Sequence, residues 1–256
     1  MATNHALPQE SIKLGGMNDY RYVGDELGLF AQASHWKRYL RGQIRPYLRG
    51  KVLEVGAGTG STTAVLCDNM QTSWLCLEPD PRLADQISKA FADRRCTAAV
   101  EVYRGTLADL PDDRRFDAIL YIDVLEHIED DQSEIARAMR HLEPQGVAIV
   151  LSPAHNFLYS PFDKSIGHFR RYNRPMLRKL ACAGLRCETL RYLDCAGMLL
   201  SLGNRLLARQ SLPTARQIRF WDQVCVPVSR RCDRWTGWRL GKSILVVYRR
   251  QGPAPA

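Results

Sequence analysis

Short apolar runs alternate with helical stretches through the middle of this sequence, and the alternation limits the possible folds more than any other feature. Parallel strands that are joined by helices form a sheet covered on both faces, so such strands are apolar throughout. The pattern predicts strands over 51–55, 74–77, 98–103, 116–122, 146–151, 185–193 and 243–248, and helices over 27–48 with a break near Pro46, 61–70, 81–91, 132–142 and 174–183. We therefore expect an α/β sheet that binds its ligand at the carboxyl ends of its strands.

A glycine-rich loop, Gly56-Ala57-Gly58-Thr59-Gly60, follows the first predicted strand. Glycines let the backbone turn sharply and approach a ligand, and the helix that follows offers free N–H groups. Glu78 stands twenty residues after Gly58, at the end of the next strand, where a carboxylate can accept hydrogen bonds from both hydroxyls of a ribose. A dinucleotide fingerprint would need a glycine at Ser61, so the loop predicts a nucleoside site of another kind.

Five segments in order carry a family resemblance: 54–60, 77–80, 109–111, 116–119 and 123–130. Together they resemble class I S-adenosylmethionine-dependent methyltransferases, in the subgroup that includes quinone-biosynthesis enzymes. The resemblance implies a Rossmann-like, seven-stranded, mostly parallel sheet with helices on both faces, an antiparallel last strand, N-terminal helices and a helical insertion before the last strand. The implied division is an N-terminal helical cap at 1–49, an S-adenosylmethionine-binding domain at 50–193, a helical lid insertion at 194–240, and the last strand and tail at 241–256.

The same resemblance assigns the cofactor, S-adenosylmethionine, to particular residues. It implies that Glu78 holds the ribose hydroxyls and that Asp123 faces the methionine end. The other implied contacts are Tyr20 in a segment that folds over the cofactor, Glu54, Gly56, Ala57 and Gly58 in the first motif, and Pro79, Thr106 and Leu107 around the adenine. Alternatives stay open for Tyr20, which also suits a surface strap, and for Glu126 and His127, which either cap the following turn or touch the ligand.

The loop after the fifth predicted strand, 152–172, lies where a substrate must meet the methyl group. His168 is the candidate general base, because histidine titrates near neutral pH. His155, Arg171 and Tyr172 are candidate substrate contacts, and an arginine can bind an anionic group through two hydrogen bonds. For both histidines the alternative is a hydrogen bond that fixes the loop. The pattern at 167–172 resembles a bacterial methyltransferase subgroup associated with glycan, lipid and natural-product pathways.

Charge is unevenly distributed along the chain. Residues 1–150 carry a formal charge of −5 and residues 151–256 carry +14. The basic part suggests an anionic substrate, a lipid surface or a nucleic acid as partner, against the alternative of a solvated surface. Within it, the arginines and tryptophans of 194–240 suit a lid over the substrate, a peripheral membrane contact or plain core packing.

Eight cysteines are present without a Cys-x-x-Cys pair or a Cys/His cluster of zinc spacing, so no metal site is expected. The Met1 end lacks an apolar signal core and no apolar run is long enough to span a membrane, so we expect a cytoplasmic protein with reduced thiols. The predicted activity is methyl transfer to O, N or C of a small anionic or amphipathic molecule, with no stable nucleic-acid partner. The alternatives are a nucleic-acid methyltransferase, a non-catalytic cofactor-binding module, and a nicotinamide-dependent oxidoreductase, which Ser61 argues against.

Overall fold

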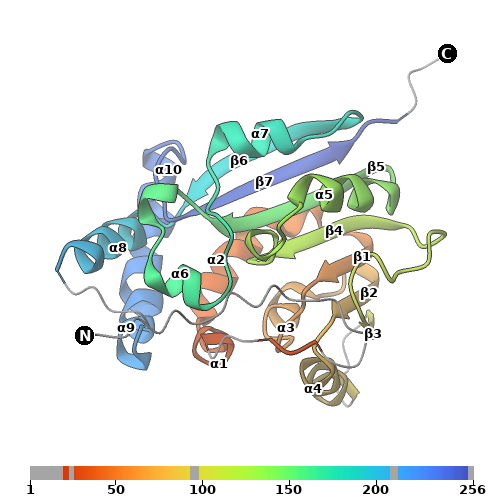
Figure 1. Cartoon of the computed structure of the whole chain (residues 1–256), viewed down its shortest axis with the longest axis horizontal. Coiled ribbons are helices and arrows are strands. Elements are labelled where there is room, and N and C mark those ends of the chain that lie inside the picture. The colour runs from red at the N-terminus through yellow and green to blue at the C-terminus, as the bar shows by residue number, and fades with distance from the viewer. Residues whose placement is uncertain (1–19, 23–25, 93–97, 208–212, 253–256) are drawn as a thin grey trace, which may run out of the picture.

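The structure, a computed structural model, describes residues 20–22, 26–92, 98–207 and 213–252. Its centre is one seven-stranded sheet with the strand order β3-β2-β1-β4-β5-β7-β6 (Figure 1). The strands are β1 Gly50–Val55, β2 Gln71–Glu78, β3 Ala99–Arg104, β4 Phe116–Ile122, β5 Leu142–Pro153, β6 Leu185–Leu193 and β7 Ser243–Arg250. Only β7 is antiparallel to its neighbours β5 and β6. The mostly parallel sheet with an antiparallel last strand is thus confirmed.

The order of the strands reverses between β1 and β4, which are adjacent and parallel. A ligand site in such a sheet lies at this switch point, outside the carboxyl ends of the strands. Because β7 runs antiparallel, its first residues lie at the same edge of the sheet as the carboxyl ends of β4 and β5. Residues just before Ser243 therefore adjoin the region where the glycine loop ends.

Helices and short turns connect the strands. They are α1 Glu26–Ala31, α2 Ser34–Ile44, η1 Arg45–Tyr47, α3 Thr63–Leu66, α4 Pro81–Ala92, η2 Leu125–His127, α5 Asp131–Arg140, η3 Asn156–Leu158, α6 Pro161–Ser165, α7 Arg174–Leu180, α8 Cys195–Leu207, α9 Ala215–Phe220, η4 Trp221–Cys225 and α10 Val226–Trp235. The run from α9 through η4 to α10 is one continuous helical rod between β6 and β7. Among the described residues, no helix combines the length and the apolar composition that crossing a bilayer requires.

The sheet divides the apolar core in two. Successive residues of a strand face opposite sides, so Trp74 and Cys76 pack with α2, α4 and the η4–α10 rod, whereas Leu75 and Leu77 pack with α5 and α7. Helices therefore cover both faces, as the apolar strands predicted (Figure 1).

Two local predictions were wrong. The helix predicted over 61–70 is only α3, because the Asp68 carboxylate accepts a hydrogen bond from Met70 N at 2.9 Å and turns the chain out of the helix. The region 152–172, predicted as a loop, contains α6, whose start is held by a capping box between Ser160 and Asp163.

Candidate functional site

The glycine loop after β1 is tied to the end of β2. Gly56 N and Ala57 N both donate hydrogen bonds to the Leu77 carbonyl, at 2.8 and 3.2 Å. Gly56 has a φ of +67°, and a Cβ atom there would lie 2.7 Å from a Val124 methyl carbon. The loop therefore passes close to the segment after β4 and requires a residue without a side chain at this point.

Glu78, at the end of β2, faces this loop. Its Oε2 accepts a 2.7 Å hydrogen bond from Gly58 N, and its Oε1 accepts one of 3.0 Å from Asp80 N. Glu78 is only 4% exposed. This burial, together with the negative charge of Asp80, raises the pKa of Glu78 to about 7. Each carboxylate oxygen has acceptor capacity left beyond its one N–H partner, so Glu78 can take two further donors such as a pair of sugar hydroxyls.

Glu54 supports the loop from within β1. Its Oε2 accepts hydrogen bonds from Thr63 Oγ1 at 2.6 Å and from Trp74 Nε1 at 3.0 Å. Burial raises its pKa to about 7. Glu54 is thus a buried anchor between β1, α3 and β2, and its effect on a ligand passes through the loop that it holds.

The turn after β3 adjoins Glu78 on its other side. Gly105 N donates to the Glu78 carbonyl at 3.1 Å. Thr106 N and Oγ1 each donate to Asp109 Oδ2 at 2.7 Å, and Leu107 is buried. The Thr106 N–H and hydroxyl are therefore already engaged, and Pro79 is half-buried beside them.

Residues 20–22 cross this region. Tyr22 N donates to Asp80 Oδ2 at 2.9 Å, and the Tyr22 ring meets the His127 ring edge to face at 5.9 Å. Burial and the nearby Glu78 carboxylate raise the pKa of Tyr20. The segment therefore links the end of β2 to the turn after β4, across the mouth of the glycine loop.

Asp123 follows β4 with a φ of +54°. Asp123 is exposed as a residue, although much of the protein lies around its carboxyl group. Loss of hydration at this group raises its pKa to about 6, while the positive charges of His168 and Lys242 lower it. Lys242, just before β7, is similarly enclosed while its side chain remains 23% exposed, and burial lowers its pKa. Asp123 and Lys242 each act on the pKa of the other, so an acid and a base lie near one another at this edge of the sheet, which we call the Asp123–Lys242 edge.

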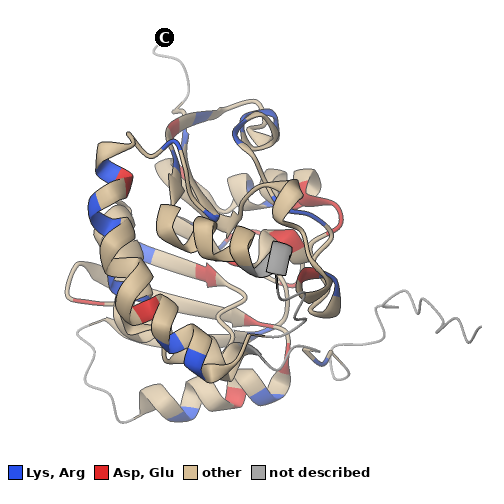
Figure 2. Cartoon of the chain, turned by 90° about the vertical axis from the view of Figure 1, so that its left-hand side faces the viewer, with Lys and Arg blue, Asp and Glu red and all other residues tan. Residues whose placement is uncertain are grey.

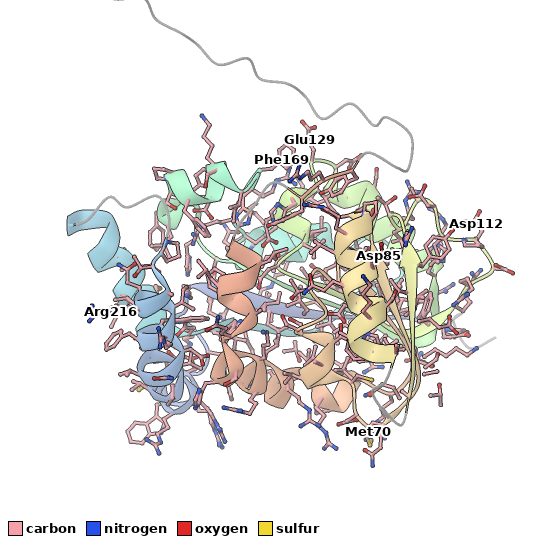
Figure 3. The ribbon with its side chains drawn as sticks, turned by 90° about the horizontal axis from the view of Figure 1, so that it is seen from below. Met70, Asp85, Asp112, Glu129, Phe169 and Arg216 are labelled. Atoms are coloured by element: carbon pink, nitrogen blue, oxygen red, sulfur yellow. The ribbon has the colours of Figure 1, made fainter. Side chains whose placement is uncertain are left out.

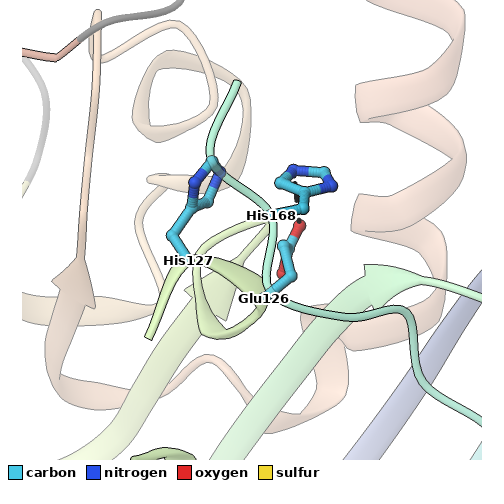
Figure 4. A group of neighbouring side chains, drawn as sticks. All are labelled: Glu126, His127 and His168. Carbon is cyan, nitrogen blue, oxygen red and sulfur yellow. Dashed lines mark ion pairs between the residues drawn. The ribbon is translucent and has the colours of Figure 1, made fainter. Parts of the chain in front are cut away.

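His168 lies near Asp123, between two other acids. Its Nδ1 is 3.0 Å from Asp163 Oδ1. Its Nε2 is 3.8 Å from Glu126 Oε1 (Figure 4). The His127 ring packs edge to face against it with the centroids 4.6 Å apart. Phe169 N donates to the Glu126 carbonyl, and Figure 3 shows Phe169 beside Glu129, so the loop that carries His168 packs on the turn after β4.

Glu126 is the buried polar group of this cluster that lacks hydrogen bonds. Neither of its carboxyl oxygens has a partner within hydrogen-bond distance. Burial, followed by the charge of Asp123, raises the pKa of Glu126 well above its ordinary value. The nearby Ser152 hydroxyl opposes this rise, and its oxygen is also buried without a hydrogen-bond partner among the described residues. Each member of the cluster offers one possible metal-ligand atom, and these atoms lie within 4.8 Å of one another: Glu126, His127 and His168. The cluster could therefore hold a metal ion.

Two predicted substrate contacts are occupied within the protein. Tyr172 is 1% exposed and donates its hydroxyl to Asp131 Oδ2 at 2.7 Å, so its hydroxyl is engaged within the core, and its role as a substrate contact stays a prediction. Arg171 forms a bidentate pair with Asp163, at 2.8 and 2.9 Å. Arg171 therefore fixes the partner of His168, and its Nε and Nη2 are not free for an anionic substrate.

His155 lies apart from the His168 cluster. Its ring stacks on Tyr192 at 4.5 Å and on Phe157 at 5.0 Å between ring centroids. Burial lowers its pKa. These contacts favour the loop-fixing alternative for His155.

Sequence reasoning missed Lys242 and its partner Asp194. Asp194 Oδ2 accepts a 2.6 Å hydrogen bond from Trp221 Nε1 and lies 3.6 Å from Lys242 Nζ, which sits 3.8 Å from the centre of a Trp221 ring. These contacts join the helical insertion to the Asp123–Lys242 edge. The signal that could have found Lys242 was a lysine directly before an antiparallel last strand.

Comparison with known proteins places these features in context. A family model described as a methyltransferase domain matches residues 53–148, which run from β1 into β5. A demethylmenaquinone methyltransferase of Tropheryma whipplei (strain Twist) is 30% identical over 154 residues, or 59% of this chain and 61% of that protein. The chain thus spans about three fifths of the length of this relative.

Two solved structures share the fold. One is a putative sarcosine dimethylglycine methyltransferase from Galdieria sulphuraria, with a TM-score of 0.58, 19% identity and 84% of each chain covered. The other is the (4+2)-cyclase SpnF, with a TM-score of 0.60, 16% identity and coverage of 84% of this chain and 81% of that one. At such identities the likeness extends to the arrangement of strands and helices alone.

Proposed function

The chain belongs to the class I S-adenosylmethionine-dependent methyltransferase superfamily, and on this premise we propose that it moves the methyl group of S-adenosylmethionine to an oxygen, nitrogen or carbon atom of a small amphipathic molecule. The observation that carries the proposal is the contact of Gly58 N with Glu78 Oε2 at 2.7 Å. It puts an acceptor for sugar hydroxyls directly against a loop in which three of the five residues are glycines, so the backbone can approach a ligand closely. Asp123, at the carboxyl end of β4, offers a second carboxylate for the cationic amino group of the methionine part.

The residues present fit the cofactor. Glu78 retains acceptor capacity, the glycine loop admits close approach, and Asp123 is reachable although enclosed. When bound, the cofactor supplies a methyl group activated by a positively charged sulfur atom. The residues that we propose to hold it are Tyr20, Gly56, Ala57, Gly58, Glu78, Pro79, Thr106, Leu107 and Asp123, with Glu54 as the anchor of the loop.

His168 is the proposed proton acceptor for a hydroxyl substrate. Asp163 accepts from Nδ1, and this hydrogen bond leaves Nε2 as the basic nitrogen of the neutral ring. Arg171 holds Asp163 from its other side, so that its carboxylate stays ionised and in place. The protein's own contribution is thus to orient the acceptor, to remove its proton at His168 Nε2 and to exclude water with residues 20–22.

An amphipathic acceptor is favoured by two observations. Lys242, whose charge acts on Asp123, lies against the Trp221 ring of the helical insertion. The Tropheryma whipplei relative is named for a quinone substrate. A short-chain demethylmenaquinol is therefore the first acceptor to try, followed by lipid-linked glycans.

The proposal is tested by titrating the purified protein with S-adenosylmethionine in a calorimeter. Wild type should bind, and Glu78→Ala should bind at least about tenfold more weakly, since a pair of charge-assisted hydrogen bonds is lost. Glu101→Ala, an exposed glutamate on neighbouring β3, is the matched control and should bind like wild type. Equal binding by both variants, or none by wild type, would refute the proposed cofactor site.

A further inference from the structure

The helical insertion separates its charges by sign. Its three acids, Asp194, Asp222 and Asp233, are all buried. Asp222 accepts from Trp36 N at 2.8 Å, and Asp233 accepts from the Tyr39 hydroxyl at 2.8 Å and from Asp194 N at 2.7 Å. The acids therefore serve as inward hydrogen-bond acceptors that fasten the rod to α2 and to the end of β6.

On the outer side of the rod, the charged side chains are all positively charged. Between residues 213 and 240 every exposed charged side chain is an arginine: Arg216, Arg219, Arg230, Arg231, Arg234 and Arg239. In the described part of the chain, none of these six forms an ion pair within 4.0 Å. Figure 2 shows the basic residues recurring along this long helical run at one end of the molecule.

Large apolar side chains are exposed among the arginines. Phe220, Val224 and Val228 follow one another at intervals of four, so they share one side of the rod, and each is about half exposed. Trp235, at the end of α10, is 93% exposed. Exposed apolar side chains that share one side of a helical run, with arginines before and after them in sequence, are typical of a helix that lies in a membrane interface.

A groove beside the rod adds to the cationic surface. It has a volume of about 770 Å³, and its lining includes His35 and Arg38 of α2 together with Arg230, Arg231, Arg234 and Trp235. Arginines bind phosphate oxygens through paired hydrogen bonds, and the groove is large enough for a phosphate-bearing headgroup.

We propose that the outer side of the α9–η4–α10 rod docks on the surface of an anionic lipid bilayer. A bilayer meets both features at once, because its headgroups neutralise the arginines while its acyl boundary receives Val224, Val228 and Trp235. A nucleic acid would match the arginines but offers no apolar phase for the two valines. The inner side of the same rod contacts Lys242 through Trp221, so docking brings the Asp123–Lys242 edge toward the membrane.

The test measures co-sedimentation with phosphatidylcholine vesicles that contain or lack phosphatidylglycerol. Wild type should bind the anionic vesicles and lose this binding at high salt. The triple variant Arg230→Glu, Arg231→Glu, Arg234→Glu should bind at least about a hundredfold more weakly, since each basic residue near an anionic surface contributes about fivefold. The assay needs neither cofactor nor acceptor, so its outcome is independent of the proposed methyl transfer.

A matched control carries the same change of charge elsewhere. Arg178, Lys179 and Arg186 are exposed on α7 and β6, and α7 covers the opposite face of the sheet. Their triple reversal to glutamate should leave vesicle binding within about threefold of wild type, because the docking surface is intact. An equal loss in both triple variants would show a nonspecific charge effect and overturn the proposal.

Trp235 gives a second readout. Its fluorescence should shift to the blue on anionic vesicles, and Trp235→Phe should abolish the shift while circular dichroism stays unchanged. Trp36, Trp74 and Trp221 are buried and should not respond. The absence of a blue shift in wild type, or tighter binding to a random oligonucleotide than to anionic vesicles through the same three arginines, would also overturn membrane docking.

Discussion

Gly58 and Glu78 lie twenty residues apart in sequence and meet at 2.7 Å, the amide nitrogen of one donating to the carboxylate of the other. The bond joins the loop after β1 to the end of β2. Glu78 is partly protonated near neutral pH, because burial raises its pKa to about 7 although this hydrogen bond opposes the rise. Cofactor binding should therefore be linked to the proton that Glu78 carries.

The affinity for S-adenosylmethionine should rise with pH through the range in which Glu78 titrates. Sugar hydroxyls donate to the ionised carboxylate, so binding lowers its pKa from about 7 and releases a proton below that pH. Affinity at pH 6 should be about tenfold lower than at pH 8. Calorimetry in buffers of different ionisation enthalpy measures the released proton, and Glu78→Gln should abolish this release.

Gly56→Ala should be more harmful than Gly58→Ala. Both glycines have positive φ, which costs an alanine about 1 kcal/mol or more. Only at Gly56 would the new Cβ meet a neighbour below contact distance, 2.7 Å from the Val124 side chain, whereas at Gly58 the nearest atom is 3.9 Å away. Urea denaturation should show the larger loss for Gly56→Ala, and equal losses would contradict the close approach of loop and turn.

Glu54→Gln should stabilise the protein at alkaline pH. Burial raises the folded pKa of Glu54 from 4.5 to about 7, so the folded state binds the extra proton between these values and wild-type stability falls as pH rises across that window. The glutamine oxygen can still accept from Thr63 and Trp74. The advantage of the variant over wild type should grow by about 3 kcal/mol from pH 4.5 to pH 8, and a difference independent of pH would show that Glu54 is not protonated in this way.

Tyr172→Phe should affect stability and leave substrate affinity unchanged. The lost hydroxyl donates to Asp131 in the core, and such a bond contributes about 1 kcal/mol. Thermal unfolding and the KM for the acceptor separate the two effects. A raised KM with unchanged stability would restore Tyr172 as a substrate contact.

The sheet and the Gly58–Glu78 pair could be predicted from sequence because each rests on a local pattern. Apolar runs of strand length are read directly, and glycine spacing after a strand reports a turn. Lys242 could not be predicted in the same way, since its place beside Asp123 depends on β7 lying between β5 and β6, an order that no local pattern shows. The same holds for Tyr172, whose partner Asp131 comes from a distant segment.

Sequence reasoning also could not separate a free arginine from an engaged one. Arg171 has the character of an anion-binding group until the fold brings it to Asp163, whose carboxylate accepts from Arg171 Nε and Nη2 and from His168 Nδ1. The short helix α6 that presents Asp163 was itself unpredicted. The supporting residues of a site therefore become visible only when the fold shows which charges are already paired.

Asp163→Asn should lower turnover while cofactor affinity stays unchanged. An amide can donate to His168 Nδ1 and stabilise the wrong tautomer, which removes the lone pair from Nε2, and the loss in kcat should be about a hundredfold or more for a hydroxyl acceptor. His168→Ala should give a similar loss, and the two changes combined should cost little more than either alone, because they disable one unit. The measurement is kcat at saturating cofactor, followed across pH, for each variant. Ser165→Ala, on the exposed end of α6, is the control and should turn over like wild type. Additive losses, or full turnover in His168→Ala, would remove the pair from the proton transfer and leave Asp163 as a loop-fixing acceptor.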